Sequence, residues 1–290
     1  MKAIEIQKLT KYYGKSRGII DLDLTVDLGD FFGFIGPNGA GKSTTIRTLL
    51  GLIQPTEGHA FLMEKDIEKE KTEILKDVGY LPSEAVFYSG MRVKEVLKYS
   101  ADLRKKDCHE EAQKLCERLQ LDPMKKVEEL SFGNRKKVAI VCALQHDPSL
   151  LILDEPTSGL DPLIQKEFFS ILKERNEKGA TIFLSSHILS EIQKNCTKAA
   201  IIREGKLVAC DTVENLSKTK AKRIHLSGDC DLSSLEKVMD IKESDQGISF
   251  LYGGDLNQLI QVLSKQNVSD LSIHEPDLEE IFMHYYTKED

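Results

Sequence analysis

The sequence lacks the features that mark several large classes of protein. It has no uninterrupted apolar run close to the roughly 20 residues that cross a bilayer, so we expect a soluble chain whose membrane association comes through a partner. The first residues, Met1–Glu5, lack the apolar core of a signal peptide and include an early acid. The net charge of -7 differs from the basic composition typical of nucleic-acid-binding proteins, so we expect no nucleic-acid partner.

Paired cysteines are also lacking, because the six cysteines are scattered without a C-x-x-C pair. This spacing favours small buried or surface thiols in a reducing cytosol over a zinc site or a disulfide framework. The 290 residues show no internal repeat and no low-complexity segment. Their number favours one main domain with a smaller appendage.

The apolar pattern predicts an α/β fold. Three continuously apolar runs, Phe31–Ile35, Leu150–Leu153 and Thr181–Leu184, are typical of strands covered on both faces. Apolar residues three and four apart predict helices over Ser43–Leu52, roughly Val93–Leu121, Gly133–Leu144 and Leu163–Lys178. Strands separated by helices indicate a parallel sheet. Before them, Ala3–Ile6 and Asp21–Asp27 alternate with period two, which predicts an N-terminal antiparallel β part.

The pattern changes after about Asp211, where shorter elements predict a small α+β appendage. We expect strands near Arg223–Leu226, Met239–Glu243, Ile248–Tyr252 and Leu271–His274, and helices at Leu232–Lys237, Leu256–Lys265 and Asp277–Tyr286. The predicted division is a main domain over 1–215, with a helical subdomain at about 84–145, and an accessory domain over 216–290.

A phosphate-binding loop follows the first buried strand. Its residues fit the pattern G-x-x-x-x-G-K-[ST] and are Gly36, Pro37, Asn38, Gly39, Ala40, Gly41, Lys42 and Ser43. The glycines let successive N–H groups face one anion, at the positive end of a new helix. Lys42 can reach the β- and γ-phosphates of a nucleotide, the Ser43 hydroxyl can bind Mg²⁺, and Thr44 can reach the α-phosphate. The alternative is a glycine-rich turn that merely enters a helix.

Two acids, Asp154 and Glu155, follow the second buried strand. The carboxyl end of a parallel strand is where ligands bind in such sheets. Asp154 suits Mg²⁺, directly or through water, and Glu155 suits a general base that polarises the attacking water. The alternative is a solvated strand end without function.

With these motifs in place, residues 1–215 resemble the ATP-binding cassette (ABC) family of P-loop NTPases. Leu130–Asn134 resembles the family signature LSGGQ, and Asp154–Pro162, which includes Asp161, is nearly identical to the Walker B and D-loop run. His187 stands where the family has its switch histidine. Tyr13 resembles the aromatic residue that stacks on adenine. Taken alone, Tyr13 would be a surface aromatic and His187 an ordinary loop histidine.

The resemblance implies an ATPase that binds ATP and Mg²⁺ and pairs head to tail with a second ATP-binding subunit, the same or a different chain. Ser131 and the Gly133 amide would contact the γ-phosphate bound by the partner, while Ser131 alone would be a plain helix N-cap. The nucleotide site would also include Asp161. The helical middle, about 84–143, would meet a separately encoded membrane permease at the cytoplasmic face of the membrane.

The closing segment, Glu275–Phe282, resembles the tail of exporter-type cassettes and favours export, and its alternative is a capped amphipathic helix. Two positions depart from the family pattern. Ser83 stands where the family has a glutamine that contacts Mg²⁺ and the attacking water, and its hydroxyl has a shorter reach. The signature carries Phe132 and Asn134 in place of glycine and glutamine, but the serine and the second glycine remain.

Two other functions compete with transport. A soluble cassette ATPase could act on ribosomes or nucleic acid, but ribosome-acting members usually carry two cassettes, and chromosome-type members have a long coiled coil that no sustained heptad supports here. An unrelated P-loop kinase or GTPase would lack the signature, the acidic pair and His187.

Overall fold

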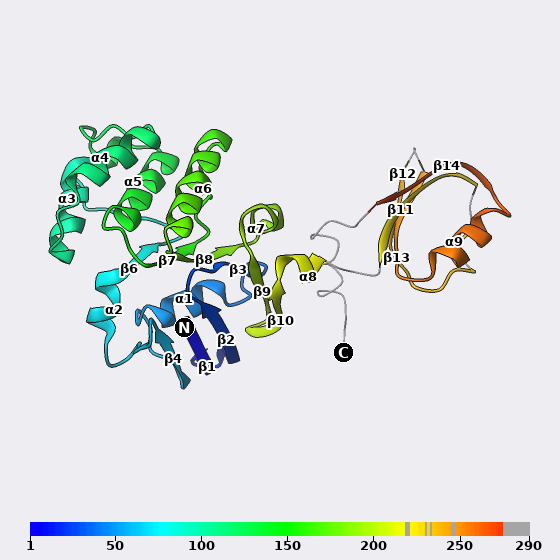
Figure 1. The fold of residues 1–290 in the computed structure, drawn as a ribbon, viewed down its shortest axis with the longest axis horizontal. Helices are drawn as coiled ribbons and strands as arrows, with labels where there is room; N and C mark the ends of the chain where they lie inside the picture. The colour runs from blue at the N-terminus through cyan, green and yellow to red at the C-terminus, as the bar shows by residue number, and fades with distance from the viewer. Residues whose placement is uncertain (218–220, 230, 233, 245–246, 275–290) are drawn as a thin grey trace. The chain divides into compact units, whose positions relative to one another are not determined.

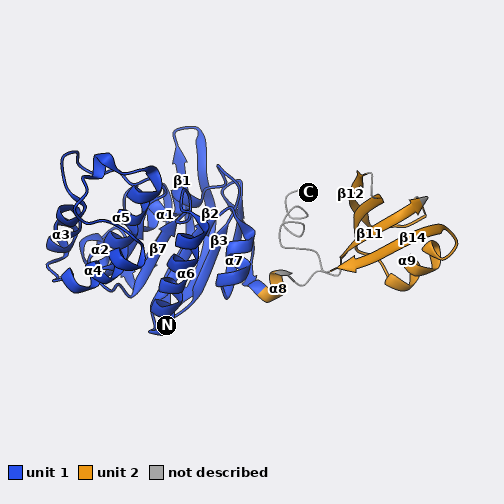
Figure 2. Cartoon of the chain, turned by 90° about the horizontal axis from the view of Figure 1, so that it is seen from above, with its two compact units in different colours: residues 1–213 blue, residues 214–290 orange. Residues whose placement is uncertain are grey.

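The residues that the structure describes form three β-sheets, two of them in a first compact unit, residues 1–213, and one in a second, residues 214–290 (Figure 2). The computed structural model describes residues 1–217, 221–229, 231–232, 234–244 and 247–274. Among these residues, none of the helices combines the length and the apolar content needed to cross a bilayer.

The first unit begins with three consecutive strands and then mixes strands and helices along the chain (Figure 1). Its strands are β1 (Lys2–Tyr13), β2 (Ser16–Asp27), β3 (Phe31–Ile35), β4 (Glu57–Leu62), β5 (Lys65–Asp66), β6 (Val78–Leu81), β7 (Leu150–Asp154), β8 (Thr181–Ser186), β9 (Lys198–Arg203) and β10 (Lys206–Thr212). Its helices are α1 (Lys42–Leu49), α2 (Lys71–Asp77), α3 (Val93–Arg104), α4 (His109–Arg118), α5 (Phe132–Leu144), α6 (Pro162–Glu177) and α7 (Leu189–Asn195), with a 3₁₀ turn at Val127–Glu129. The helix α8 (Val213–Ser217) begins at the end of this unit.

The central sheet has the strand order β10-β9-β3-β8-β7-β6, and every neighbouring pair is parallel except β10 with β9. Every residue of β3, β7 and β8 is buried, as their continuous apolar runs predict. In Figure 1, α5 and α6 lie on one side of this sheet, and α1 with β1 and β2 on the other. The expected parallel α/β core is therefore confirmed.

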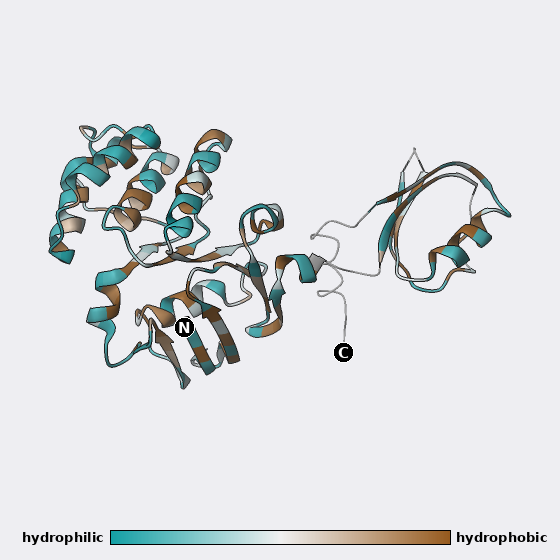
Figure 3. Ribbon diagram, viewed as in Figure 1, coloured by the Kyte–Doolittle hydropathy of each residue, from teal (hydrophilic) through white to brown (hydrophobic). Residues whose placement is uncertain are grey.

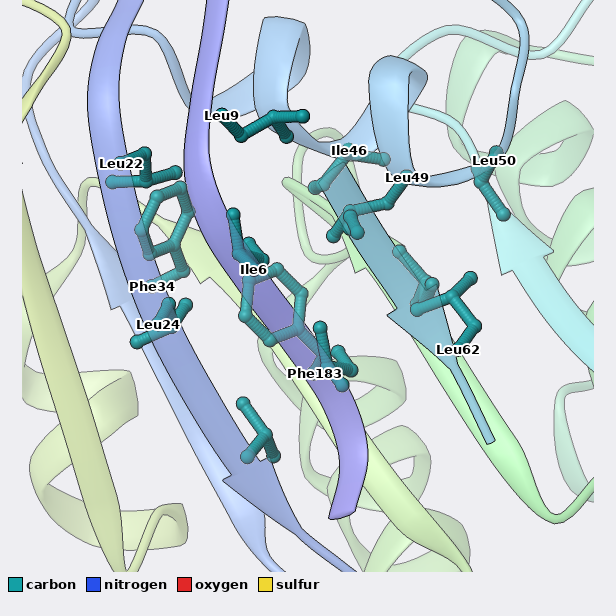
Figure 4. Close-up of a cluster of buried hydrophobic side chains, with 14 of the residues drawn as sticks. Ile6, Leu9, Leu22, Leu24, Phe34, Ile46, Leu49, Leu50, Leu62 and Phe183 are labelled. Atoms are coloured by element: carbon teal, nitrogen blue, oxygen red, sulfur yellow. The ribbon is translucent and has the colours of Figure 1, made fainter. Parts of the chain in front are cut away.

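The second sheet of this unit is antiparallel, with the order β2-β1-β4-β5. Its inner face and the central sheet share one core (Figure 4). Phe183 on β8 stacks on Phe32 with ring centroids 5.8 Å apart, and Phe34 lies 5.3 Å from Phe183. Burying one such side chain contributes about 1.5–3 kcal/mol to the free energy of folding, so these rings stabilise the strands that carry the loops described below.

The helical middle, predicted as helical over about Val93–Leu121, consists of two helices, α3 and α4. The chain breaks between them because Lys105 adopts a left-handed conformation, with φ 55°, which ends α3. The helices carry apolar and polar residues on different sides (Figure 3). Arg118 on α4 binds Glu167 and Glu174 of α6, and Arg175 of α6 binds Glu111 of α4, so ion pairs run both ways between the two helices.

The second unit has an antiparallel sheet with the order β12-β13-β11-β14 and one described helix that packs against it. Its elements are β11 (Lys222–Asp229), β12 (Val238–Ser244), β13 (Gly247–Tyr252), α9 (Leu256–Leu263) and β14 (Asn267–His274). The four predicted strands are confirmed. The helix predicted at Leu232–Lys237 is wrong, because a single turn, closed by Leu235 N–H to Leu232 O, places both leucines on the core. The predicted helix at Asp277–Tyr286 lies outside the described residues.

Candidate nucleotide site

Four loops leave the parallel sheet at the same edge, because they follow the carboxyl ends of β3, β8, β7 and β6. The strand register aligns Ile35 with Ser186, Ser185 with Asp154, and Leu153 with Leu81. The phosphate loop, His187 and Glu155 directly follow their strands, and Ser83 comes two residues after the end of β6. The predicted site residues from these four segments are therefore gathered by the topology itself.

The phosphate loop runs from Gly36 to Gly41 between β3 and α1. A Cβ on Gly36 would lie 2.5 Å from the Ile202 carbonyl oxygen, so no other residue fits there without movement. Gly41 caps α1 with φ 112°, a conformation that L side chains rarely adopt. Pro37, Asn38 and Gly39 form the exposed tip of the loop, whereas Ala40 is buried and accepts a hydrogen bond from Gly205 N–H.

Three ionisable side chains converge beside this loop. The Lys42 ammonium is 6% exposed, donates to the Gly36 carbonyl at 2.6 Å, and lies 3.2 Å from Glu155 Oε1. His187 Nδ1 lies 2.7 Å from Glu155 Oε2. Glu155 is thus held between a cation from the phosphate loop and an imidazole from the end of β8, which is the geometry expected of a catalytic carboxylate.

Asp154 lies at the end of β7 and is fully buried. Its Oδ1 accepts a hydrogen bond from Ser185 Oγ at 2.7 Å, whereas its Oδ2 has no hydrogen-bond partner among the described residues. A buried carboxylate oxygen without a partner is costly unless a ligand satisfies it. Asp154 therefore fits a hard cation such as Mg²⁺.

Tyr13 lies at the end of β1 and is 46% exposed. Its ring reaches the phosphate-loop helix across Gly18, because a Cβ on Gly18 would lie 3.2 Å from Tyr13 Cε2 and 3.0 Å from Thr44 Cγ2. Tyr13 and Thr44 thus border the same space. An exposed aromatic face in this place is suited to stacking on a base.

The signature residues contact a different loop. Ser131 caps α5 by accepting a hydrogen bond from Asn134 N–H, and Asp161 caps α6 by accepting one from Ile164 N–H. A Cβ on Gly133 would lie 2.4 Å from the Gly159 carbonyl oxygen, so the signature packs on the D-loop of its own chain. Phe132 packs on Gly159 as well.

Ser83 follows β6, and its carbonyl accepts a hydrogen bond from Lys136 Nζ at 2.9 Å. Lys136 is on α5 and only 1% exposed. Burial lowers the pKa of Lys136 to about 8, although the carboxylates of Asp154 and Glu155 oppose this shift. This lysine was not among the predicted site residues, although a cation on the otherwise apolar side of the predicted helix was an available signal.

Comparison with known proteins identifies the family of this chain. A sequence model of the family described as ABC transporter matches residues 19–158. The bacitracin transport ATP-binding protein BcrA of Bacillus licheniformis is 37% identical, over 97% of this chain and 96% of its own length. The chain belongs to the ABC transporter ATP-binding proteins.

Other proteins agree with this assignment. An uncharacterized ABC transporter ATP-binding protein of Bacillus subtilis (strain 168), YhaQ, is 32% identical over 97% of both chains. A solved ATP-binding subunit of an ABC transporter superposes with a TM-score of 0.71 at 30% identity, over 74% of this chain and 91% of that chain. The cassette is therefore an ATPase that binds ATP and hydrolyses it to power transport. These relatives support transport and not an action on ribosomes, and they exclude an unrelated kinase or GTPase.

Ser185 was not among the predicted site residues either. It directly follows the apolar run of β8 and pairs with Asp154 in the neighbouring strand. Its hydroxyl holds the Asp154 carboxylate, and its backbone carbonyl accepts a hydrogen bond from Glu155 N–H at 3.2 Å. A serine at the carboxyl end of a buried strand was the available signal, but the partner strand is not evident from sequence.

Proposed function

We propose that this cassette hydrolyses ATP with Glu155 as the general base, and that it drives an integral membrane permease in the direction of export. The observation that supports the catalytic part is the position of the Glu155 carboxylate, 3.2 Å from the Lys42 ammonium and 2.7 Å from His187. Lys42 belongs to the phosphate loop, so a carboxylate at this distance from it is within reach of a water next to the γ-phosphate.

In this proposal Glu155 accepts a proton from the water while the water oxygen bonds to the γ-phosphorus and the bond to the ADP oxygen breaks. Lys42 stabilises the negative charge on the phosphate oxygens. His187, with its proton on Nδ1, donates to Glu155 Oε2 and holds the carboxylate in place. The backbone N–H groups of residues 38–44, including those of Ser43 and Thr44, surround the phosphates.

Mg²⁺ would be held by the Ser43 hydroxyl, by Asp154 Oδ2 and, through water, by the Ser83 hydroxyl. When bound, it neutralises charge on the β- and γ-phosphate oxygens. The partnerless Oδ2 of buried Asp154 supports this assignment. Ser131, Gly133 and Asp161 would serve the nucleotide of a second ATP-binding subunit, in a homodimer or a heterodimer.

Replacing Tyr13 with alanine should weaken ATP binding by about 5- to 150-fold, since stacking on a base is worth roughly 1–3 kcal/mol. Tyr13→Phe keeps the aromatic ring and should bind ATP nearly as well as the unchanged protein. Tyr12→Ala, at the neighbouring exposed tyrosine, is the matched control. Fluorescence titration of ATP measures all three, and an unchanged affinity in Tyr13→Ala would exclude the stacking role.

A hollow of about 450 Å³ supports the permease partner. It is lined by residues of the segment that follows Ser83 and by the first turn of α5, among them Val86, Phe87 and Phe132. Val86 is 90% exposed and the nearby Tyr88 is 73% exposed. Apolar side chains gathered around a hollow are typical of a protein-protein contact. We assign this contact to a cytoplasmic segment of the permease, which would hold the cassette at the cytoplasmic face of the membrane.

The test is a pull-down from detergent-solubilised membranes of the protein's own source, with Glu155→Gln as bait and ATP present. Recovery of one stoichiometric multi-span membrane protein is the expected result. Val86→Asp should reduce that recovery at least several-fold without loss of folding, whereas Leu52→Asp, at an exposed leucine (51% exposed) outside the hollow, should not. Recovery of soluble partners alone would overturn the permease assignment and leave the ATPase in place.

One observation supports export: the segment Glu275–Phe282, which lies outside the described residues, resembles exporter tails. The bacitracin transport protein, which is similar over nearly the whole chain, supports transport. ATP-dependent movement of a cargo out of loaded proteoliposomes, with the cassette on the inner side, is the direct measurement. Movement only in the opposite direction would contradict the proposal.

A further inference from the structure

The backbone of Glu155 is in a conformation that side-chain-bearing residues rarely adopt. Its φ is 47°, in the left-handed region. Such residues persist only where their surroundings hold them, and they concentrate at functional sites. Glu155 must therefore be held by contacts to its own backbone groups.

Those contacts come from two directions. The N–H of Glu155 donates to Ser185, whose carbonyl and hydroxyl oxygens both lie 3.2 Å away. The carbonyl of Glu155 accepts a hydrogen bond from Lys136 Nζ at 3.0 Å. The N–H side is thus fixed from within the sheet, whereas the carbonyl side is fixed by a side chain of α5.

Lys136 makes two further bonds of the same kind. Its ammonium donates to the carbonyls of Pro82 and Ser83, each at 2.9 Å. An ammonium has three donors, and these three carbonyls use all of them in a place where the lysine is 1% exposed. A buried charge that is fully hydrogen-bonded fixes the groups around it, because leaving any of them unpaired is costly.

We propose that Lys136 is a positioning residue for ATP hydrolysis: by binding the carbonyls of Glu155, Pro82 and Ser83, it holds Glu155 in the left-handed conformation that directs its carboxylate toward Lys42 and His187. This inference rests on the proposed role of Glu155 as the base. Without the lysine, Glu155 relaxes to an ordinary conformation, and its Cα–Cβ bond then points elsewhere. Lys136 acts through Glu155 and touches no reacting atom.

Lys136→Met keeps the length of the side chain and removes its donors. We expect kcat for ATP hydrolysis to fall about 100-fold, the effect of misplacing a catalytic group by about 1 Å, while KM and the affinity for ATP stay nearly unchanged. Lys136→Gln, whose amide donates two hydrogen bonds, should recover part of kcat. Lys137→Met is the matched control, because it removes a lysine that is also buried (8% exposed) at the next position of α5, and its kcat should be nearly unchanged.

A double-mutant cycle with Glu155→Gln separates positioning from a general structural effect. If Lys136 acts through Glu155, Lys136→Met should add almost nothing to the loss already caused by Glu155→Gln, so the two effects are strongly non-additive. Thermal unfolding of each variant checks the fold, and Lys136→Gln takes the place of Lys136→Met in the cycle if the methionine variant does not fold.

Additive effects in the cycle, or a near-normal kcat in both Lys136 variants, would overturn the inference. The failure of the proposed function gives a different result: Glu155→Gln alone would then hydrolyse ATP at a near-normal rate. If Glu155→Gln is inactive and both Lys136 variants are active, the base stands and the positioning role of Lys136 falls.

Discussion

Replacing Glu155 with glutamine should lower kcat for ATP hydrolysis by about 10²- to 10⁴-fold, the range for loss of a general base, and leave ATP binding intact. Glutamine has the shape of glutamate and can still bond to His187, but its amide cannot take a proton from water. The phosphate loop and Tyr13 are unchanged, so the nucleotide still binds. Phosphate release measures the rate, and fluorescence titration measures the affinity.

The matched control for this variant is Glu191→Gln. Glu191 is also a buried carboxyl near the site, bonded by Ser186 Oγ at 2.9 Å, and burial raises its pKa. Its replacement should change kcat only slightly. In Glu155→Gln, ATP binding without hydrolysis should also trap the ATP-bound dimer, which gel filtration or light scattering detects. Near-normal turnover in Glu155→Gln would exclude Glu155 as the base.

Replacing Lys42 with alanine should weaken ATP binding itself by about 10- to 150-fold, because a hydrogen bond to a charged group contributes roughly 1.5–3 kcal/mol. The Lys42 ammonium is nearly buried and oriented by the carbonyls of Gly36 and Pro37, so it presents its charge to a phosphate with little loss of side-chain freedom. Isothermal titration with ATP is the measurement.

Lys71→Ala provides the control for this variant, since Lys71 donates to the Gly51 carbonyl beyond the end of α1 and outside the loop. Its ATP affinity should remain unchanged. Hydrolysis by Lys42→Ala should fall through kcat as well as KM, because Lys42 also stabilises the charge on the phosphate oxygens during hydrolysis. An unchanged affinity in Lys42→Ala would contradict the role of this lysine in holding the phosphates.

The strands of the central sheet were predictable from sequence where complete burial requires a continuous run of apolar residues. The strands β3, β7 and β8 are continuous apolar runs; β7 and β8 have a helix on either side in the chain, and β3 is followed by one. The strand β6 was not predicted, because Val78–Leu81 is only four residues long and includes Gly79, which lies against the Ala143 carbonyl. Such a strand is stabilised by its neighbour β7 and by α5, and neither contact is visible in a local pattern.

The residues of the candidate site likewise fall into those that the sequence predicts and those that it does not. Lys42 was predicted from the phosphate-loop motif, Glu155 from its place after a buried strand, and His187 from the resemblance to the ABC family. The role of Lys136 could not be predicted from a motif or from a strand end, since its acceptors are backbone carbonyls up to 54 positions away in the chain. A carbonyl is the same in every residue, so the sequence around residues 82 and 155 gives no sign of this lysine.

The ion pairs between α4 and α6 hold these two helices together, so we expect them to move as one body. Arg118 of α4 pairs with carboxylates of α6, and Arg175 of α6 pairs with a carboxylate of α4, so separating the two helices would break all of these ion pairs. The helix α6 begins directly after its cap residue Asp161, so we expect a displacement of α4 to reach residues 156–161 through α6. The paired side chains are partly exposed, so salt weakens the attraction between them. Coupling between the helical middle and the nucleotide site is thus expected to decline as ionic strength rises, while the buried bonds of Lys136 keep their strength.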